Sequence, residues 1–179
     1  MLVINIPSVE LYNEKTEEFI TTEECTLELE HSLISLSKWE SKWKKPFISS
    51  DNKTTEETID YIRCMLLDED KKDNIKYLTP KDIKKINDYI SDPMTATTFY
   101  EENTSFRKKE TITSELIYYW MVASNIPMEC QNWHLNRLLT LIRICSIKNT
   151  PPKKMSKREI MSRNKALNEA RRNQLHTSG

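Results

Sequence analysis

Cys130 and His134 come closest, by residue type and spacing, to forming a chemical site in this sequence. They are four positions apart, so on one helix the thiol and the imidazole would lie on the same face. Such a pair could supply two ligands to a metal ion or act as a cysteine–histidine nucleophile. A zinc site needs three or four protein ligands, and His31 and His176 are distant in the sequence. We therefore expect no metal site here, but a buried cysteine beside a partly exposed histidine.

The acidic residues do not form an evident catalytic pair. Many are adjacent, as in Glu56–Glu57 and Glu101–Glu102, and neighbouring residues on a helix or a strand point in different directions. The only glycine is Gly179, which excludes phosphate-binding and dinucleotide-binding loops, because both need glycine for their backbone geometry. The residues thus predict a protein that is not an enzyme and has no cofactor.

The composition is that of a protein with a charged surface and enough apolar residues for one core. The chain has 179 residues, of which 37% are hydrophobic and 30% charged, and this length suits a single domain with a tail or a small appendage. No apolar run approaches the roughly 20 residues of a membrane span, and the N-terminus lacks the pattern of a secretory leader. We therefore expect the protein to stay in the cytoplasm. Its four cysteines form no Cys-x-x-Cys pair and are expected to be reduced thiols: Cys25, Cys64, Cys130 and Cys145.

The charges are distributed very unevenly, although the formal net charge is zero. Residues 1–30 contain eight glutamates and one lysine, whereas residues 148–179 contain nine lysines and arginines and two glutamates. The basic end could attract an acidic partner, contact the acidic end of another copy, or fold back onto the acidic end of its own chain. It could equally be a solvated helix without a partner, because surface charges contribute little to stability.

The hydrophobic pattern predicts a mainly α fold, namely a helical bundle with a small N-terminal β-hairpin and a basic C-terminal helical extension. Alternating apolar residues near the N-terminus and a turn-like sequence at residues 13–16 favour the hairpin. From Thr26 the apolar residues follow helical spacing up to Pro46, which predicts the first helix. The expected parts are a hairpin appendage over residues 1–25, a helical core domain over 26–149 and the basic extension over 150–179.

Capping signals and apolar stripes predict further helices in the core domain. Threonine or serine precedes acidic or proline-containing first turns at three places, a pattern that is typical of helix starts: Thr54 or Thr55, Thr79, and Thr113 or Ser114. The most apolar long run, residues 131–145, is expected to form the central core helix. Residues 94–109 favour a loop, and a polar helix is expected from Ser156 to about Gln174.

The tryptophans and the basic extension are the candidate contact residues. Tryptophans on helix faces with aliphatic neighbours are more often core or interface anchors than platforms for nucleobases. The extension has no aromatic side chain except that of His176, so a contact with nucleic acid would neutralise phosphates without reading bases. We predict protein contacts through Trp39, Trp43, Lys153, Lys154, Lys157, Arg158, Arg163, Arg171 and Arg172. The alternative for the two tryptophans is that both belong to the core.

Several longer stretches resemble a family of small virion-morphogenesis proteins encoded by tailed bacteriophages and prophages. The most specific are LEHSLISLSKWESKW at residues 29–43, ELIYYWM at 115–121 and WHLNRLLTLI at 133–142. Shorter stretches that resemble the same family lie between and beyond them, at residues 45–47, 55–62, 94–97, 125–127, 152–156 and 166–168. The resemblance therefore covers nearly the whole chain, in one order.

This family resembles tail assembly chaperones, and membership implies a mostly helical protein that holds the long tape-measure protein soluble until the tail-tube subunits polymerise around it. The implied partner is a phage tail protein, either the tape measure or a tube or baseplate subunit, met in the host cytoplasm. Self-association through the acidic and basic ends would be a second kind of contact. The first alternative is a structural component of the tail or baseplate in the virion, and the second is a non-specific nucleic-acid-binding protein. The resemblance implies no catalytic residue.

Overall fold

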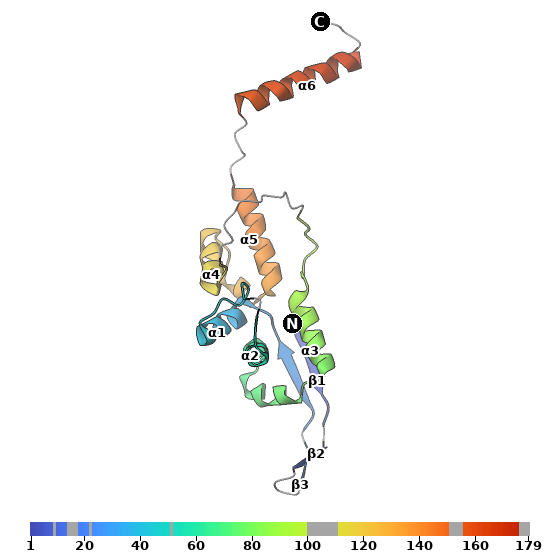
Figure 1. Cartoon of the computed structure of the whole chain (residues 1–179), viewed down its shortest axis with the longest axis vertical. Helices are drawn as coiled ribbons and strands as arrows, with labels where there is room; N and C mark the ends of the chain where they lie inside the picture. Colours follow the sequence, from blue (N-terminus) through green and yellow to red (C-terminus); the bar gives the residue numbers. More distant parts are fainter. Residues whose placement is uncertain are drawn as a thin grey trace. The chain divides into compact units, whose positions relative to one another are not determined.

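The fold is mainly helical, with a small antiparallel strand pair near the N-terminus, as the sequence predicts. The computed structural model describes residues 1–8, 10–13, 18–21, 23–50, 52–99, 111–150 and 156–175 (Figure 1). The chain divides into two compact units, Met1–Ser146 and Ile147–Gly179. The second unit therefore begins three residues before the predicted boundary at residue 150.

Strands β1 (Leu2–Ile6) and β4 (Cys25–Leu29) lie side by side and antiparallel, with Leu2 opposite Leu29 and Ile6 opposite Cys25 (Figure 1). Alternate residues face the interior, because successive side chains of a strand point to opposite faces. The chain between them forms a second antiparallel pair, in which β2 (Glu10–Asn13) runs beside β3 (Glu18–Thr21). The buried residues of β1 and β4 are Ile4, Ile6, Leu27 and Leu29.

Strand β4 shows that the predicted start of the first helix at Thr26 is wrong. The leucines at 29, 33 and 36 have helical spacing, but residues 25–29 pair with β1 and the helix begins only at Leu33. The other edge of β4 is also paired, since Leu67 N donates to Glu28 O at 3.0 Å. Because the strands share one core with the helices, residues 1–25 are not the separate appendage that we predicted.

The helix starts in the first unit follow local capping chemistry. Ser32 caps the first helix by accepting a hydrogen bond from Ser35 N, and Thr54 and Thr79 each form a capping box with the acid three residues later. The predicted cap at Thr79 is confirmed, and of the two candidates before α2 the structure selects Thr54 and not Thr55. The elements of this part are α1 (Leu33–Trp43), α2 (Thr55–Met65), the 3-10 helix η1 (Glu69–Tyr77) and α3 (Pro80–Ser91).

The next helices pack around a second cluster of buried side chains, to which α1 contributes Leu33 and Leu36. Thr113 is the N-cap of α4 (Ser114–Ala123), which decides between the two predicted caps. Helix α5 (Leu135–Asn149) confirms the predicted core helix but starts four residues later than expected, because a short 3-10 helix, η2 (Met128–Asn132), precedes it. Of the loop predicted over 94–109, the described residues 94–99 contain no helix or strand, and 100–109 lie outside the described residues.

The core consists of two clusters of buried side chains that meet at α1. Trp39 belongs to the cluster formed with β1, β4, α2, η1 and α3. Leu33 and Leu36 belong to the cluster formed with α4, η2 and α5. Phe47, in the turn after α1, packs against both clusters. Helix α1 therefore fixes the positions of the elements on its two sides.

The second unit contains α6 (Lys157–Leu175), close to the extent predicted for the polar helix. Every side chain that the structure describes on α6 is exposed, including those of Ile160, Met161 and Leu167. A helix with this little burial has no core of its own, so its stability rests on backbone hydrogen bonds and local charge pairs.

Candidate protein-binding surface

The structure places Trp39 inside the protein and not on a contact surface. Its side chain is 0% exposed, and its indole Nε1 donates a hydrogen bond to Glu57 O at 2.8 Å. Trp39 also packs edge-on against Phe47. The prediction of a direct protein contact through Trp39 is therefore wrong in this fold, because the indole fills the core between α1 and α2.

Trp43 lies one turn later on α1 and is half-buried. Its ring stacks on that of Trp39 with centroids 6.2 Å apart, and its Nε1 donates to Asp60 Oδ2 at 2.8 Å. Trp43 thus connects α1 to α2 while part of its side chain remains accessible. Its predicted role as a contact residue stays a prediction.

The predicted basic contacts lie in the second unit. Lys153 and Lys154 lie outside the described residues. The other five are exposed side chains on α6, which leaves them accessible to a partner: Lys157, Arg158, Arg163, Arg171 and Arg172. The structure thus divides the predicted contact residues between the two units.

Cys130 and His134 do not share a helix, so the geometry assumed for a metal or nucleophile pair does not exist. Cys130 lies on η2, whereas His134 precedes α5 and its Nε2 is 3.0 Å from Tyr89 O. His134 is buried and not partly exposed as we expected, and its ring packs against that of His31 with centroids 5.0 Å apart. Among the residues that the structure describes, no three His, Cys, Asp or Glu side chains are placed to hold a metal ion.

His31 is a buried histidine that the sequence offers no reason to single out. Its Nδ1 lies 2.5 Å from the hydroxyl of Tyr61, and its side chain is 3% exposed. Burial, together with the neighbouring His134, lowers the pKa of His31 to about 3. His31 is therefore neutral at physiological pH, and it links the segment between β4 and α1 to α2.

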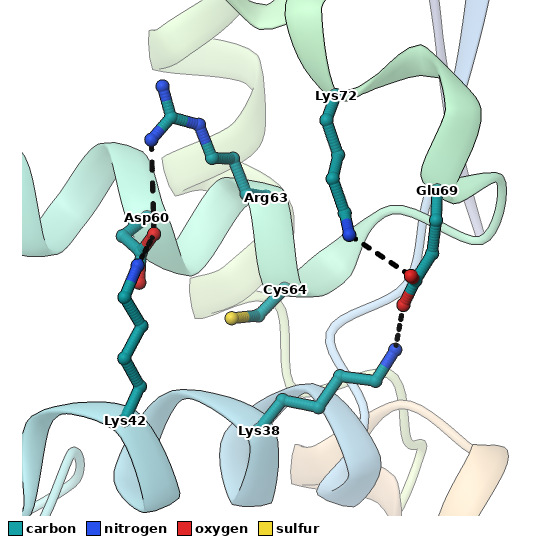
Figure 2. A pocket seen from close by; sticks show the side chains of 7 residues that line it. All are labelled: Lys38, Lys42, Asp60, Arg63, Cys64, Glu69 and Lys72. Carbon is teal, nitrogen blue, oxygen red and sulfur yellow. Dashed lines mark hydrogen bonds and ion pairs between the residues drawn. The ribbon is translucent and has the colours of Figure 1, made fainter.

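Charged side chains gather around Cys64 at the surface formed by α1, α2 and η1. Figure 2 shows these charged side chains around a hollow of about 290 Å³, which we call the charged hollow: Lys38, Lys42, Asp60, Arg63, Glu69 and Lys72. Asp60 Oδ1 pairs with Lys42 Nζ at 2.5 Å and more distantly with Arg63, at 3.9 Å. Burial opposes ionisation of Asp60, but the hydrogen bonds from Lys42 and Trp43 outweigh it and keep the pKa of Asp60 below its ordinary value.

Glu69 holds the other end of the charged hollow. Its two carboxylate oxygens accept hydrogen bonds from Lys38 and Lys72, both at 3.0 Å (Figure 2). These bonds, that of Lys38 first, lower the pKa of Glu69. Burial and the nearby Asp60 raise the pKa of the Cys64 thiol, so Cys64 is a protonated thiol at neutral pH and a poor nucleophile. The hollow is an ion-pair network with four cations and two carboxylates.

A second and larger concavity, which we call the apolar groove, lies between α2, η1 and α3. Its volume is about 480 Å³, and Arg63 lines both this groove and the charged hollow. Thr55 and Thr58 lie along its α2 side, and Lys53 and Lys76 complete its polar lining. The apolar side chains that line it are Ile59, Ile62, Ile75, Leu78 and Ile83.

The groove could not be read from the sequence, because its residues come from three elements and their flanks, spread over residues 53–83. Each element shows an apolar stripe in the sequence, but a stripe alone does not reveal which of its residues remain uncovered. A usable signal was the repeated pairing of isoleucine with a neighbouring cation, as at Ile62–Arg63 and Ile75–Lys76. Such pairs are typical of a rim where an apolar surface meets water.

The comparisons with known proteins add no homologue to this picture. Within the described ranges, no helix combines the length and the apolar character needed to cross a membrane. The chain matches no family model, no curated protein and no solved structure.

Proposed function

We propose that this chain is a non-enzymatic assembly protein of a tailed bacteriophage, and that it holds the tape-measure protein or another tail protein in a soluble state before the tail is built. The apolar groove between α2, η1 and α3 is the observation that carries the proposal. A groove of this kind receives the apolar face of a client helix, which would otherwise aggregate. The resemblance of the sequence to phage morphogenesis proteins supplies the choice of client.

The groove is suited to reversible binding of a protein segment. Ile59, Leu78 and Ile83 are only partly buried, although all three pack against the first core cluster. Their exposed surface is the part that a client would cover. At roughly 25 cal/mol per Å², each ~100 Å² of apolar area that the client covers supplies about 2.5 kcal/mol, which suits a complex that must later release its client.

Removal of the gene from the phage or prophage that carries it tests the proposed role. Heads without tails, or tails of abnormal length, are the expected products in electron micrographs. Mass spectrometry of purified wild-type particles should find the protein absent or far below the copy number of tail subunits. A stoichiometric copy number would instead identify a structural component of the tail or baseplate.

A variant that blocks the groove connects the role to the site. Thr55 is exposed and lines the groove, so Thr55→Trp places a bulky ring at its mouth without removing a core side chain. A phage with Thr55→Trp should show the same tail defect as the deletion. Thr55→Ala is the matched control and should give normal tails. Normal tails in both variants would contradict binding in the groove.

Binding to DNA would instead identify the chain as a non-specific nucleic-acid-binding protein. The exposed basic residues of α6 would then contact phosphates, and the affinity would fall steeply as salt is raised. We expect no binding to duplex DNA at physiological salt.

A further inference from the structure

We infer that the segment which enters the apolar groove is an amphipathic helix with acidic flanks. This inference rests on the proposed function, because it describes the client that the proposed function requires. It adds the chemical class of the partner, which neither the fold nor the resemblance specifies.

The lining of the groove gives the first part of the argument. Its apolar floor is formed by isoleucines of α2, η1 and α3 and by Leu78 between η1 and α3. Its accessible part is the partly buried Ile59, Leu78 and Ile83, whereas Ile62 and Ile75 are buried. A helix can cover such a floor with residues spaced three or four positions apart, which form one continuous apolar stripe. The floor therefore selects for an amphipathic segment.

The charges on the rim give the second part. Within the described part of the chain, the residues that line the groove include the cations Lys53, Arg63 and Lys76 and no acid. Lys76 is exposed, and its ammonium lies 4.9 Å from the ring centroid of Tyr77. The flanks of a client helix would lie against this rim. Acidic flanks would speed association with the basic rim and fix the position of the helix in the groove, whereas basic flanks would be repelled.

The charged hollow extends the positive surface beyond the groove. Arg63 belongs to both concavities, and Lys38, Lys42 and Lys72 follow it around the hollow (Figure 2). Each carboxylate of the hollow is shared by two cations, so a net positive charge remains there. Glu69 is 59% exposed, whereas Asp60 is 6% exposed. An acidic side chain of the client can therefore join the exposed cluster around Glu69 while Asp60 keeps its partners.

The same charges argue against the basic helix of this protein as the occupant of the groove. Helix α6 contains six lysines and arginines and two glutamates, so it would bring like charge to the rim. A client with acidic flanks has the complementary charge.

Two synthetic helical peptides of about 18 residues test the inference. Both have the same leucine stripe, and their flanking residues are glutamate in one and lysine in the other. Fluorescence anisotropy with the full-length protein should show at least about tenfold tighter binding of the glutamate peptide at low salt. The difference should shrink as salt is raised, because the rim charges are accessible to counterions. Equal affinities, tighter binding of the lysine peptide or no binding of either peptide would overturn the inference.

A charge reversal at the rim locates the binding. Lys76→Glu should weaken binding of the glutamate peptide by about fivefold and strengthen binding of the lysine peptide. Lys84→Glu is the matched control, since Lys84 is exposed on α3, does not line the groove and changes the net charge equally. It should leave both affinities unchanged. Circular dichroism and urea unfolding of both variants establish that they are folded before binding is compared.

The oligomeric state separates a client from a second copy of this chain. Sedimentation of the full-length protein at about 0.15 M salt, where charge-driven contacts are screened, should give the same oligomeric state for wild type and Lys76→Glu. A change of state in Lys76→Glu would show that another copy occupies the groove and would overturn the inference. Particle composition and the deletion phenotype test the phage role independently, so that role can stand even if the peptides show no preference for acidic flanks.

Discussion

At the scale of single residues, the buried polar side chains of the first unit are engaged in structural hydrogen bonds. Buried Glu40 accepts hydrogen bonds from Phe47 N at 2.8 Å and from Ser114 N at 2.7 Å, and thus links α1 to α4. His31, Tyr61 and His134 satisfy one another or nearby backbone groups. Within the described residues, no buried side-chain nitrogen or oxygen lacks a hydrogen-bond partner. A buried polar group with a partner supports a fold and does not by itself indicate catalysis.

Replacement of the two tryptophans should separate their roles. Trp39→Ala should lower the free energy of unfolding by about 3–5 kcal/mol, because it empties a fully buried site and removes the bond to Glu57 O. Trp43→Ala should lower it by about 1–3 kcal/mol, since the ring is only half-buried. Urea unfolding measures both. Equal and small effects would contradict the core position of Trp39.

His31 should make stability depend on pH on the acidic side of neutrality. Its pKa is about 3 in the folded protein and 6.5 in an unfolded chain, so between these values the unfolded state binds a proton that the folded state does not. The contribution of His31 is complete above pH 6.5 and declines as the pH falls, by up to about 1.4 kcal/mol per pH unit.

The range from pH 6.5 to 5 separates the effect of His31 on stability from that of the carboxylates. The carboxylates with lowered pKa values change the pH dependence of stability only below about pH 4.5. Urea unfolding of wild type across this window should show the decline. His31→Asn keeps a polar atom near the Tyr61 hydroxyl and should have a flatter profile. A change of the His31 ring signals in NMR between pH 7 and 5 would show that the ring is protonated there, and would refute the explanation.

At the scale of elements, capping is the feature that local sequence predicts best. Thr54→Ala removes the hydroxyl that accepts from Glu57 N, so it should lower the free energy of unfolding by about 1 kcal/mol. Thr55→Ala, at the next residue, should stay within about 0.5 kcal/mol of wild type, because Thr55 is exposed and is not the cap. Thermal or urea unfolding of the pair measures the difference. Equal stabilities would show that the capping box contributes nothing to α2.

Pairing between distant residues is the part of the fold that the sequence could not supply. The cap at Thr79 depends on Asp82, three residues away, and was predicted. Strand β4 depends on β1, whose paired residues lie 19 to 27 positions earlier, and the helical spacing of Leu29 and Leu33 concealed it. The same limit applies to the groove, because Ile59 and Ile83 become neighbours along its wall only after α2 and α3 have packed. Local propensity is overridden wherever tertiary pairing decides the structure.

At the scale of the whole molecule, the two units differ in how they are stabilised. The first unit, Met1–Ser146, contains both core clusters, whereas the described side chains of the second unit, Ile147–Gly179, are exposed. The first unit can therefore hold a groove with a fixed lining. The second presents the basic residues of α6 to the solvent. A packed unit with a groove and a unit with exposed basic side chains would suit the role proposed above, in which the protein acts by contact with other macromolecules.

The opposite charges of the two ends should make the full chain self-associate weakly at low salt. The sequence has a surplus of glutamate in residues 1–30 and of lysine and arginine in residues 148–179, so head-to-tail contacts between copies are attractive. The screening length falls from about 30 Å at 0.01 M to about 8 Å at 0.15 M salt. Sedimentation equilibrium should therefore show association at the lower salt and a monomer at the higher one.

Charge reversal assigns this association to the basic end. Arg171→Glu combined with Arg172→Glu should abolish it, because the two substitutions remove much of the positive charge of α6. Lys81→Glu combined with Lys84→Glu changes the net charge equally on α3 and should reduce the association far less. Association that persists at the higher salt would require an apolar contact between copies. If Thr55→Trp also abolished that association, the contact would lie in the groove, and a second copy would occupy the place of a client.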